Sequence, residues 1–353
     1  MISSLLMTWA AALAAPAAAG EGWIAEWDVA AKAAKAAGKD LLVDFTGTDW
    51  CGWCIKLDEE VFAHDTFKTA IVADYVLCAL DFPRGDEAKA KVPNAARNEE
   101  LREKFGVNGF PSILLMTADG ELYARTGYEA GGPEAYLKHL AELRASGRPK
   151  LVEIAALEKL VAAAADAAAK AQALDAVLAK LEGETAGSPF AVRLAALAKQ
   201  ALVEGGDAAQ RLRALKAIFA AGQADAALND VARTADPKNE HGLLERVVLA
   251  EMATLDAPDK VAPFAKKIDE LDAMGPLKDM KVAFELFMNA AFFNVRFLND
   301  PAAALKYAGK VKATGQPIPP RAQQVLDQIE KDAQKAADKP AEKPAEAGDG
   351  KGG

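Results

Sequence analysis

Two cysteines, Cys51 and Cys54, lie two residues apart in the run Asp-Trp-Cys-Gly-Trp-Cys at positions 49–54. An apolar, strand-like run at 41–45 precedes them, and a helical pattern at 55–62 follows. At a helix N-terminus, unpaired backbone N–H groups and the positive end of the helix dipole stabilise a thiolate. Because a thiolate is the nucleophile that attacks a disulfide sulfur, this arrangement predicts reversible disulfide chemistry.

The same spacing also occurs in zinc sites, but those need two further ligands. The remaining cysteine is Cys78, and the three histidines are scattered at His64, His139 and His241. We therefore expect no metal site. We interpret Cys78 as a small buried apolar residue of a strand rather than as a third redox thiol. From the spacing alone, a static disulfide or a degenerate pair that only packs stays an alternative.

The order of motifs over residues 21–147 resembles that of a thioredoxin-fold protein. The Cys-x-x-Cys motif is followed by an apolar run at 75–81 and by Gly-Phe-Pro-Ser at 109–112, which resembles the family's cis-proline loop. A hairpin pattern at 113–125 and a closing helix at 133–143 complete the order. The motif itself is closer to a bacterial exported thioredoxin-like subfamily than to thioredoxin. The resemblance implies an α/β domain with a central mixed sheet flanked by helices.

The resemblance also implies roles for individual residues. Cys51 would be the exposed attacking thiol, and Cys54 would be the buried resolving thiol. Pro111 would follow a cis peptide bond and lie against the Cys51 sulfur. Phe110 would offer its main-chain groups to an extended substrate peptide, as in strand addition.

Trp50 and Trp53 would flank the thiols with apolar surface in a protein of this kind, although simple packing is the alternative for both. Asp44 would be the buried acid that takes the Cys54 proton and returns it, which requires a pKa raised by burial. The loop after Asp44 is longer than in thioredoxin, so Asp49 is a rival for this role. The run at 76–80 contains no lysine to pair with a buried acid.

The composition bounds the compartment and the partners. The chain has 353 residues and a net charge of −9, which argues against a nucleic-acid binder because phosphate binding needs a basic face. Residues 1–19 are uncharged and end in Ala-Ala-Ala, which predicts a signal peptide and a periplasmic or secreted protein. An Ala-rich N-terminal extension and an uncleaved anchor are the alternatives. We expect no transmembrane span in the mature chain.

Beyond a boundary at 146–149, residues 151–336 are rich in Ala, Leu, Lys and Glu with apolar residues at helical spacing. This predicts an all-α domain. A weak internal repeat relates 255–268 to 298–311, which suits a tetratricopeptide-like or HEAT-like array, and an irregular all-helical bundle is an equal alternative. Residues 337–353 form a low-complexity tail that we expect to be disordered.

Two functions fit these patterns. The first is an exported thiol–disulfide oxidoreductase that acts on protein disulfides or dithiols through a mixed disulfide. It needs no cofactor but needs a separate thiol redox partner that recycles it. The second is a non-catalytic envelope scaffold that binds through its helical domain and uses the thioredoxin-like part as an adaptor. We favour the enzyme because strand, motif, helix and proline loop occur together. The Gly-Trp pair between the cysteines leaves the direction of electron flow open.

Overall fold

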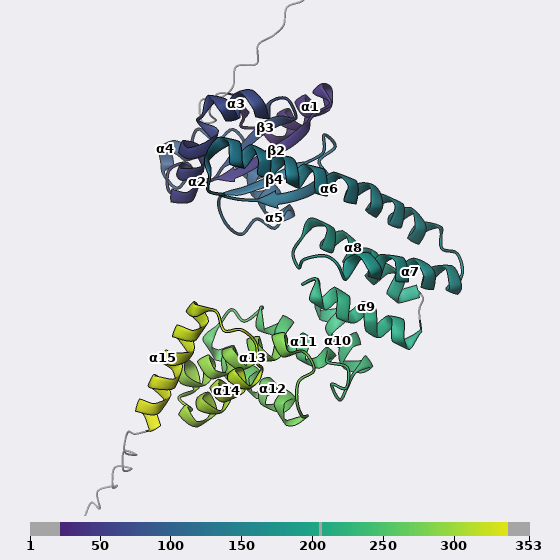
Figure 1. The fold of residues 1–353 in the computed structure, drawn as a ribbon, viewed down its shortest axis with the longest axis vertical. Helices are drawn as coiled ribbons and strands as arrows, with labels where there is room; N and C mark the ends of the chain where they lie inside the picture. The colour runs from purple at the N-terminus through teal and green to yellow at the C-terminus, as the bar shows by residue number, and fades with distance from the viewer. Residues whose placement is uncertain (1–21, 205–206, 338–353) are drawn as a thin grey trace, which may run out of the picture. The chain divides into compact units, whose positions relative to one another are not determined.

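The computed structural model describes residues 22–204 and 207–337 (Figure 1). The chain divides into two compact units, residues 1–163 with 187–194, and residues 164–186 with 195–353. The predicted signal peptide lies outside the described residues, as does the predicted tail beyond residue 337. The domain boundaries inferred from composition stay predictions.

A five-stranded sheet forms the centre of the first unit, with the order β1-β3-β2-β4-β5. Strands β1 and β2 run parallel to β3, whereas β4 runs antiparallel to both β2 and β5. This confirms the predicted mixed sheet. The strands are β1 (Trp23–Ile24), β2 (Asp40–Thr46), β3 (Tyr75–Asp81), β4 (Ser112–Met116) and β5 (Leu122–Thr126).

Strand β2 lies at the centre of the sheet and is buried along its whole length. Successive side chains of a strand point to opposite faces, so a central strand is covered on both sides. Leu41, Val43 and Phe45 point to one face, where they pack with α1 (Trp27–Ala37) and α5 (Ala95–Lys104).

The opposite face of β2 carries two acidic residues, Asp40 and Asp44. Here the aromatic ring of Phe62 packs edge-on against Tyr136, with ring centroids 5.9 Å apart. This face therefore combines an aromatic core with two buried carboxyl groups. It is covered by α3 (Asp65–Ile71) and α6 (Gly132–Ala163).

The motif helix begins directly after Cys51. It consists of α2 (Gly52–Leu57), which continues as the π-helical turn η1 (Asp58–Phe62). A short helix, α4 (Asp86–Lys89), occupies the polar segment between β3 and α5. The thiol pair thus lies where the chain passes from the central strand to a helix, as the sequence predicted.

Helix α6 is longer than expected. The sequence predicted a helix that ends at residue 143, but α6 runs to Ala163 with Pro149 inside it. A Cβ at Gly147 would lie 2.5 Å from the Tyr123 carbonyl oxygen, so glycine lets the helix pack directly against β5. Arg144 and Arg148 both contact Asp40, at 3.0 and 3.3 Å. These long-range contacts hold the helix past the residues that resembled a linker.

The second unit is helical, as predicted. Its core includes Phe264 and Tyr307, which occupy equivalent places in the weak repeat and are both buried. The repeat itself stays a prediction. Within the described ranges, no helix combines the length and apolar character needed to cross a membrane. After α6 the helices are α7 (Ala167–Leu181), α8 (Pro189–Glu204), α9 (Ala208–Ala220), α10 (Ala226–Ala235), α11 (Leu243–Met252), η2 (Pro258–Lys260), α12 (Val261–Ala273), α13 (Met280–Phe293), η3 (Asn294–Leu298), α14 (Pro301–Ala313) and α15 (Pro320–Ala337).

Candidate active site

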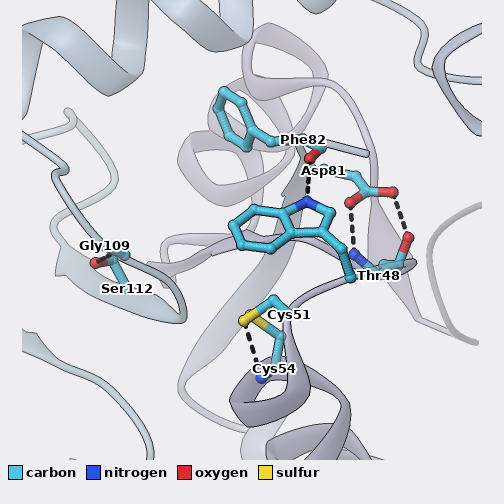
Figure 2. Close-up of a disulfide and its surroundings, with 8 residues drawn as sticks. Thr48, Cys51, Cys54, Asp81, Phe82, Gly109 and Ser112 are labelled. Carbon is cyan, nitrogen blue, oxygen red and sulfur yellow. Dashed lines mark hydrogen bonds between the residues drawn. A yellow bond between two sulfur atoms is a disulfide. The ribbon is translucent and has the colours of Figure 1, made fainter. Parts of the chain in front are cut away.

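Cys51 and Cys54 form a disulfide at the start of α2 (Figure 2). Their Cα atoms are 5.2 Å apart. Cys51 is the N-cap residue of the helix, and its Sγ accepts a hydrogen bond from the Cys54 backbone N–H at 3.2 Å. The helix N-terminus therefore directs a backbone donor at the first sulfur, which is the environment that stabilises a thiolate after reduction.

The expectation that Cys51 is exposed is wrong for this disulfide form. Cys51 and Cys54 are each only 5% exposed. The reason is local: the Cys51 sulfur is bonded to Cys54 and lies against the backbone of the first helical turn. The two cysteine residues are thus equally buried in the disulfide form.

Trp50 is fixed beside the disulfide by three contacts. Its indole Nε1 donates a hydrogen bond to the Phe82 carbonyl oxygen at 2.8 Å (Figure 2). Its ring meets Phe110 edge-on at 5.6 Å, and the Arg84 guanidinium lies 3.8 Å from the ring centroid. A Cβ at Gly47 would lie 2.7 Å from the indole, so glycine at this loop position lets the ring lie in its observed place.

The predicted proline loop is adjacent to the motif through that contact between Phe110 and Trp50. The peptide bond between Phe110 and Pro111 is cis, as the resemblance implied. The Ser112 hydroxyl donates to the Gly109 carbonyl oxygen at 2.8 Å and closes the loop (Figure 2). Phe110 therefore stands next to Trp50 of the motif, and the contact of Pro111 with the Cys51 sulfur stays a prediction.

Trp53 lies in a different environment from Trp50. It is 58% exposed, and its ring contacts Tyr128 at 5.1 Å. The Lys56 ammonium lies about equally close to both rings, and the Tyr128 hydroxyl donates to Glu60 at 2.6 Å. Exposure on this scale argues against the alternative that Trp53 is simply packed. The sequence carried no signal for Tyr128, because it follows β5 far from the motif.

A cavity of about 240 Å³ lies behind the disulfide, and both Asp44 and Cys54 line it. Asp44 is 7% exposed, and its Oδ1 has no hydrogen-bond partner. Burial, reinforced by the nearby Asp58 and Asp81, raises the pKa of Asp44 to about 8. The longer loop has therefore not displaced Asp44 from the neighbourhood of Cys54.

Asp49, the alternative candidate for the proton-carrying acid, instead makes hydrogen bonds to another loop. Its carboxylate accepts the backbone N–H groups of Arg84 and Gly85, at 3.0 and 2.6 Å. These hydrogen bonds lower the pKa of Asp49. Asp49 does not line the cavity. It connects the motif loop to the segment after β3 and is poorly suited to carry a proton.

A second connection between the same loops comes from Thr48 and Asp81. The Asp81 carboxylate accepts both the backbone N–H and the hydroxyl of Thr48, at 3.0 and 2.7 Å (Figure 2).

In the part of the chain that the structure describes, no three His, Cys, Asp or Glu side chains are arranged to hold a metal ion. Cys78 is fully buried, and burial raises the pKa of its thiol, as expected of a core residue.

Several known proteins are similar to this chain. Residues 27–144 match the family model of the thioredoxin-like domain. A disulfide bond reductase, DsbH, from Chlamydia pneumoniae is 33% identical over 99 residues, covering 28% of this chain and 58% of that protein. A thioredoxin-related protein, DsbJ, from the same organism is 28% identical over 103 residues, covering 29% of each chain. A solved structure of a DsbH oxidoreductase is 27% identical, with a TM-score of 0.31, and covers 41% of this chain and 96% of that one.

Residues 27–144 thus form a thioredoxin-like domain that carries a Cys-x-x-Cys pair and has homologues among disulfide-handling proteins. The chain spans 58% and 29% of the lengths of the two curated relatives. The family match ends at residue 144, so it does not extend to the helices of the second unit.

Proposed function

We propose that the protein is a thiol–disulfide oxidoreductase that acts on protein disulfides or dithiols through Cys51 and Cys54. The observation that carries this proposal is the disulfide at the helix N-terminus, with Asp44 lining the same cavity as Cys54. A strongly perturbed carboxyl group beside a thiol is a candidate proton carrier.

In the reducing direction, the Cys51 thiolate attacks one sulfur of a substrate disulfide. A mixed disulfide forms, and the other substrate sulfur leaves as a thiolate that takes a proton from water. Cys54 then loses its proton to the Asp44 carboxylate, and its thiolate attacks the Cys51 sulfur. The intramolecular disulfide forms, the second substrate thiolate leaves, and two electrons have passed to the substrate.

The surface around the pair supports a protein substrate. Trp50, Phe110 and the cis-proline loop form one wall, and the exposed Trp53 with Tyr128 offers a second apolar surface. We assign substrate contacts to Trp50, Trp53, Phe110 and Pro111. Aromatic side chains of this kind supply large contact areas for peptides.

Different features support the direction of electron flow and the cellular compartment. A homologue described as a disulfide bond reductase supports reduction, which requires a separate thiol donor to recycle the protein. The uncharged, Ala-rich residues 1–19 support export to the periplasm or the medium. Fractionation of cells that express the full chain tests export directly, and a cytoplasmic protein with its full mass would contradict it.

Trapping tests the proposed activity. In Cys54→Ala the resolving thiol is absent, so mixed disulfides with Cys51 should accumulate and disappear on treatment with dithiothreitol. Cys51→Ser is the matched control and should trap nothing. The scaffold alternative predicts that neither variant forms reducible adducts, and that outcome would reject the oxidoreductase.

A further inference from the structure

Asp58 lies on the motif helix, shortly after the thiol pair. It lies four residues after Cys54, and its backbone N–H donates to the Cys54 carbonyl oxygen. Residues at this spacing lie on one face of a helix. Asp58 is exposed to solvent, yet it lines the same cavity as Cys54 and the buried Asp44. It also begins the π-helical turn η1, a type of irregularity that occurs often at functional sites.

The cavity is suited to water. At about 240 Å³ it can hold several water molecules. Thr46 and Thr48 add hydroxyl groups to its wall, and none of the described residues that line it is basic. Asp81 is occupied by Thr48, but the Asp44 Oδ1 is buried without a hydrogen-bond partner. Asp44 itself lines the cavity and keeps 7% of its surface exposed, so water in the cavity can reach its carboxyl group.

The groups that face Asp44 come from each element packed against it. Besides burial, Asp58 of η1 and Asp81 of β3 raise the pKa of Asp44. Burial raises the pKa values of Cys78 in β3 and Tyr136 in α6, and the Asp44 charge adds to both shifts. These neighbours are acidic or neutral. With a pKa of about 8, Asp44 holds a proton near neutral pH, and it must lose that proton before it can accept another from Cys54.

We propose that Asp58 is a positioning residue that acts through Asp44, exchanging the Asp44 proton with bulk water through this cavity. The Asp44 proton passes by way of cavity water to the Asp58 carboxylate and then to solvent. The Asp44 carboxylate then takes the proton of Cys54, whose thiolate attacks the Cys51 sulfur. This inference rests on the proposed redox chemistry of the pair, but not on any particular protein substrate.

The experiment uses the reduced full-length protein and dithiobis(nitrobenzoate), an aromatic disulfide, in a stopped-flow instrument. Attack by Cys51 releases the first nitrothiobenzoate, and attack by Cys54 on the mixed disulfide releases the second. The two thiols are oxidised to a disulfide while the reagent is reduced to two thiolates. The second release reports the step that needs Asp44 as a base.

Asp58→Asn should slow the second release at pH 7 by about tenfold and leave the first release unchanged. The effect is smaller than the roughly hundredfold or more of a direct general acid–base group, because Asp58 acts through Asp44. Added formate, a small carboxylate that fits the cavity, should restore the rate, and so should the conservative variant Asp58→Glu. Glu59→Gln is the matched control. Glu59 also lines the cavity, but it does not share the helix face of Cys54, which Asp58 does. Its replacement removes the same charge and should change the rate of the second release by less than about twofold.

Whether the second release becomes slower or faster distinguishes a proton relay through Asp58 from a purely electrostatic effect of its charge. Removing a negative neighbour lowers the pKa of Asp44, so more carboxylate is present at pH 7 and the second release would become faster. A faster second release in Asp58→Asn, equal effects in Asp58→Asn and Glu59→Gln, or no response to formate would overturn the relay. If the wild-type protein gives no second release, the relay and the proposed function both fail. A normal second release with no adduct trapped by Cys54→Ala overturns the protein-substrate proposal alone.

Discussion

The two ends of strand β2 carry the same side chain in opposite circumstances. Asp40 is 2% exposed and is surrounded by donors: the Tyr123 hydroxyl at 2.9 Å, Arg144 Nε at 3.0 Å and Arg148 at 3.3 Å. Asp44, four residues on and on the same face, is 7% exposed and has one oxygen without a partner.

Burying a carboxylate without compensation is costly, so the two ends reach different solutions. The donors around Asp40 compensate its charge and connect α6 to the sheet. Asp44 keeps its proton instead, because burial and acidic neighbours raise its pKa to about 8. We infer that the Asp40 end maintains the fold, whereas the Asp44 end is prepared for proton transfer beside the thiols.

The largest effect on stability should come from removing the compensated acid. Asp40→Ala leaves Arg144 and the Tyr123 hydroxyl without their buried acceptor, so we expect a loss of about 3 kcal/mol in the free energy of unfolding. Urea denaturation measures it. Asp74→Ala removes the exposed partner of Arg144 and should cost less than about 1 kcal/mol. Equal losses in the two variants would contradict the assignment of Asp40 as the structural acid.

The opposite sign is expected at Asp44. Its pKa is raised from 3.8 to about 8 on folding, so the folded state binds a proton more tightly than the unfolded state. The folded protein loses stability relative to an unfolded chain in which Asp44 ionises freely. This loss is absent below pH 4 and grows as the pH rises towards 8. Asp44→Asn in the oxidised protein should therefore gain about 2 kcal/mol or more of stability at pH 8 and nothing at pH 4. Urea denaturation at both pH values checks this, and a pH-independent difference would refute it.

A smaller effect is expected where the chain leaves the Asp44 end. Gly47→Ala places a Cβ 2.7 Å from the Trp50 indole, so the ring must move and the free energy of unfolding should fall by about 1 kcal/mol. Gly52→Ala is the matched control, because a Cβ there meets nothing within 4 Å. Thermal unfolding of both variants tests the pair. Equal midpoints would mean that Trp50 is not held in this position.

Local sequence signals predicted much of this domain. The run around Val43 and the spacing of Cys51 and Cys54 each depend on neighbouring residues, and the structure has the expected strand and helix N-terminus. The resemblance to thioredoxin-fold proteins then implied the mixed sheet and the cis bond before Pro111, and the structure has both.

Contacts between residues that lie far apart in the sequence could not be predicted from it. The length of α6 depends on Gly147 against Tyr123 and on two arginines against Asp40, which no local pattern records. The burial of Cys51 belongs to the folded disulfide form, which the spacing of the two cysteines alone does not specify. The cavity between Asp44 and Asp58 depends on how the motif helix packs over the sheet, and periodicity alone cannot specify such packing.

The most direct test of the account is the redox equilibrium of Cys51 and Cys54. The protein is equilibrated with glutathione buffers at pH 7, and alkylation then measures the reduced fraction of the pair. We predict reversible interconversion with one midpoint between about −270 and −120 mV, the range of working thioredoxin-fold pairs. A pair that stays oxidised in every buffer while the protein remains folded would show a structural disulfide and would contradict the account.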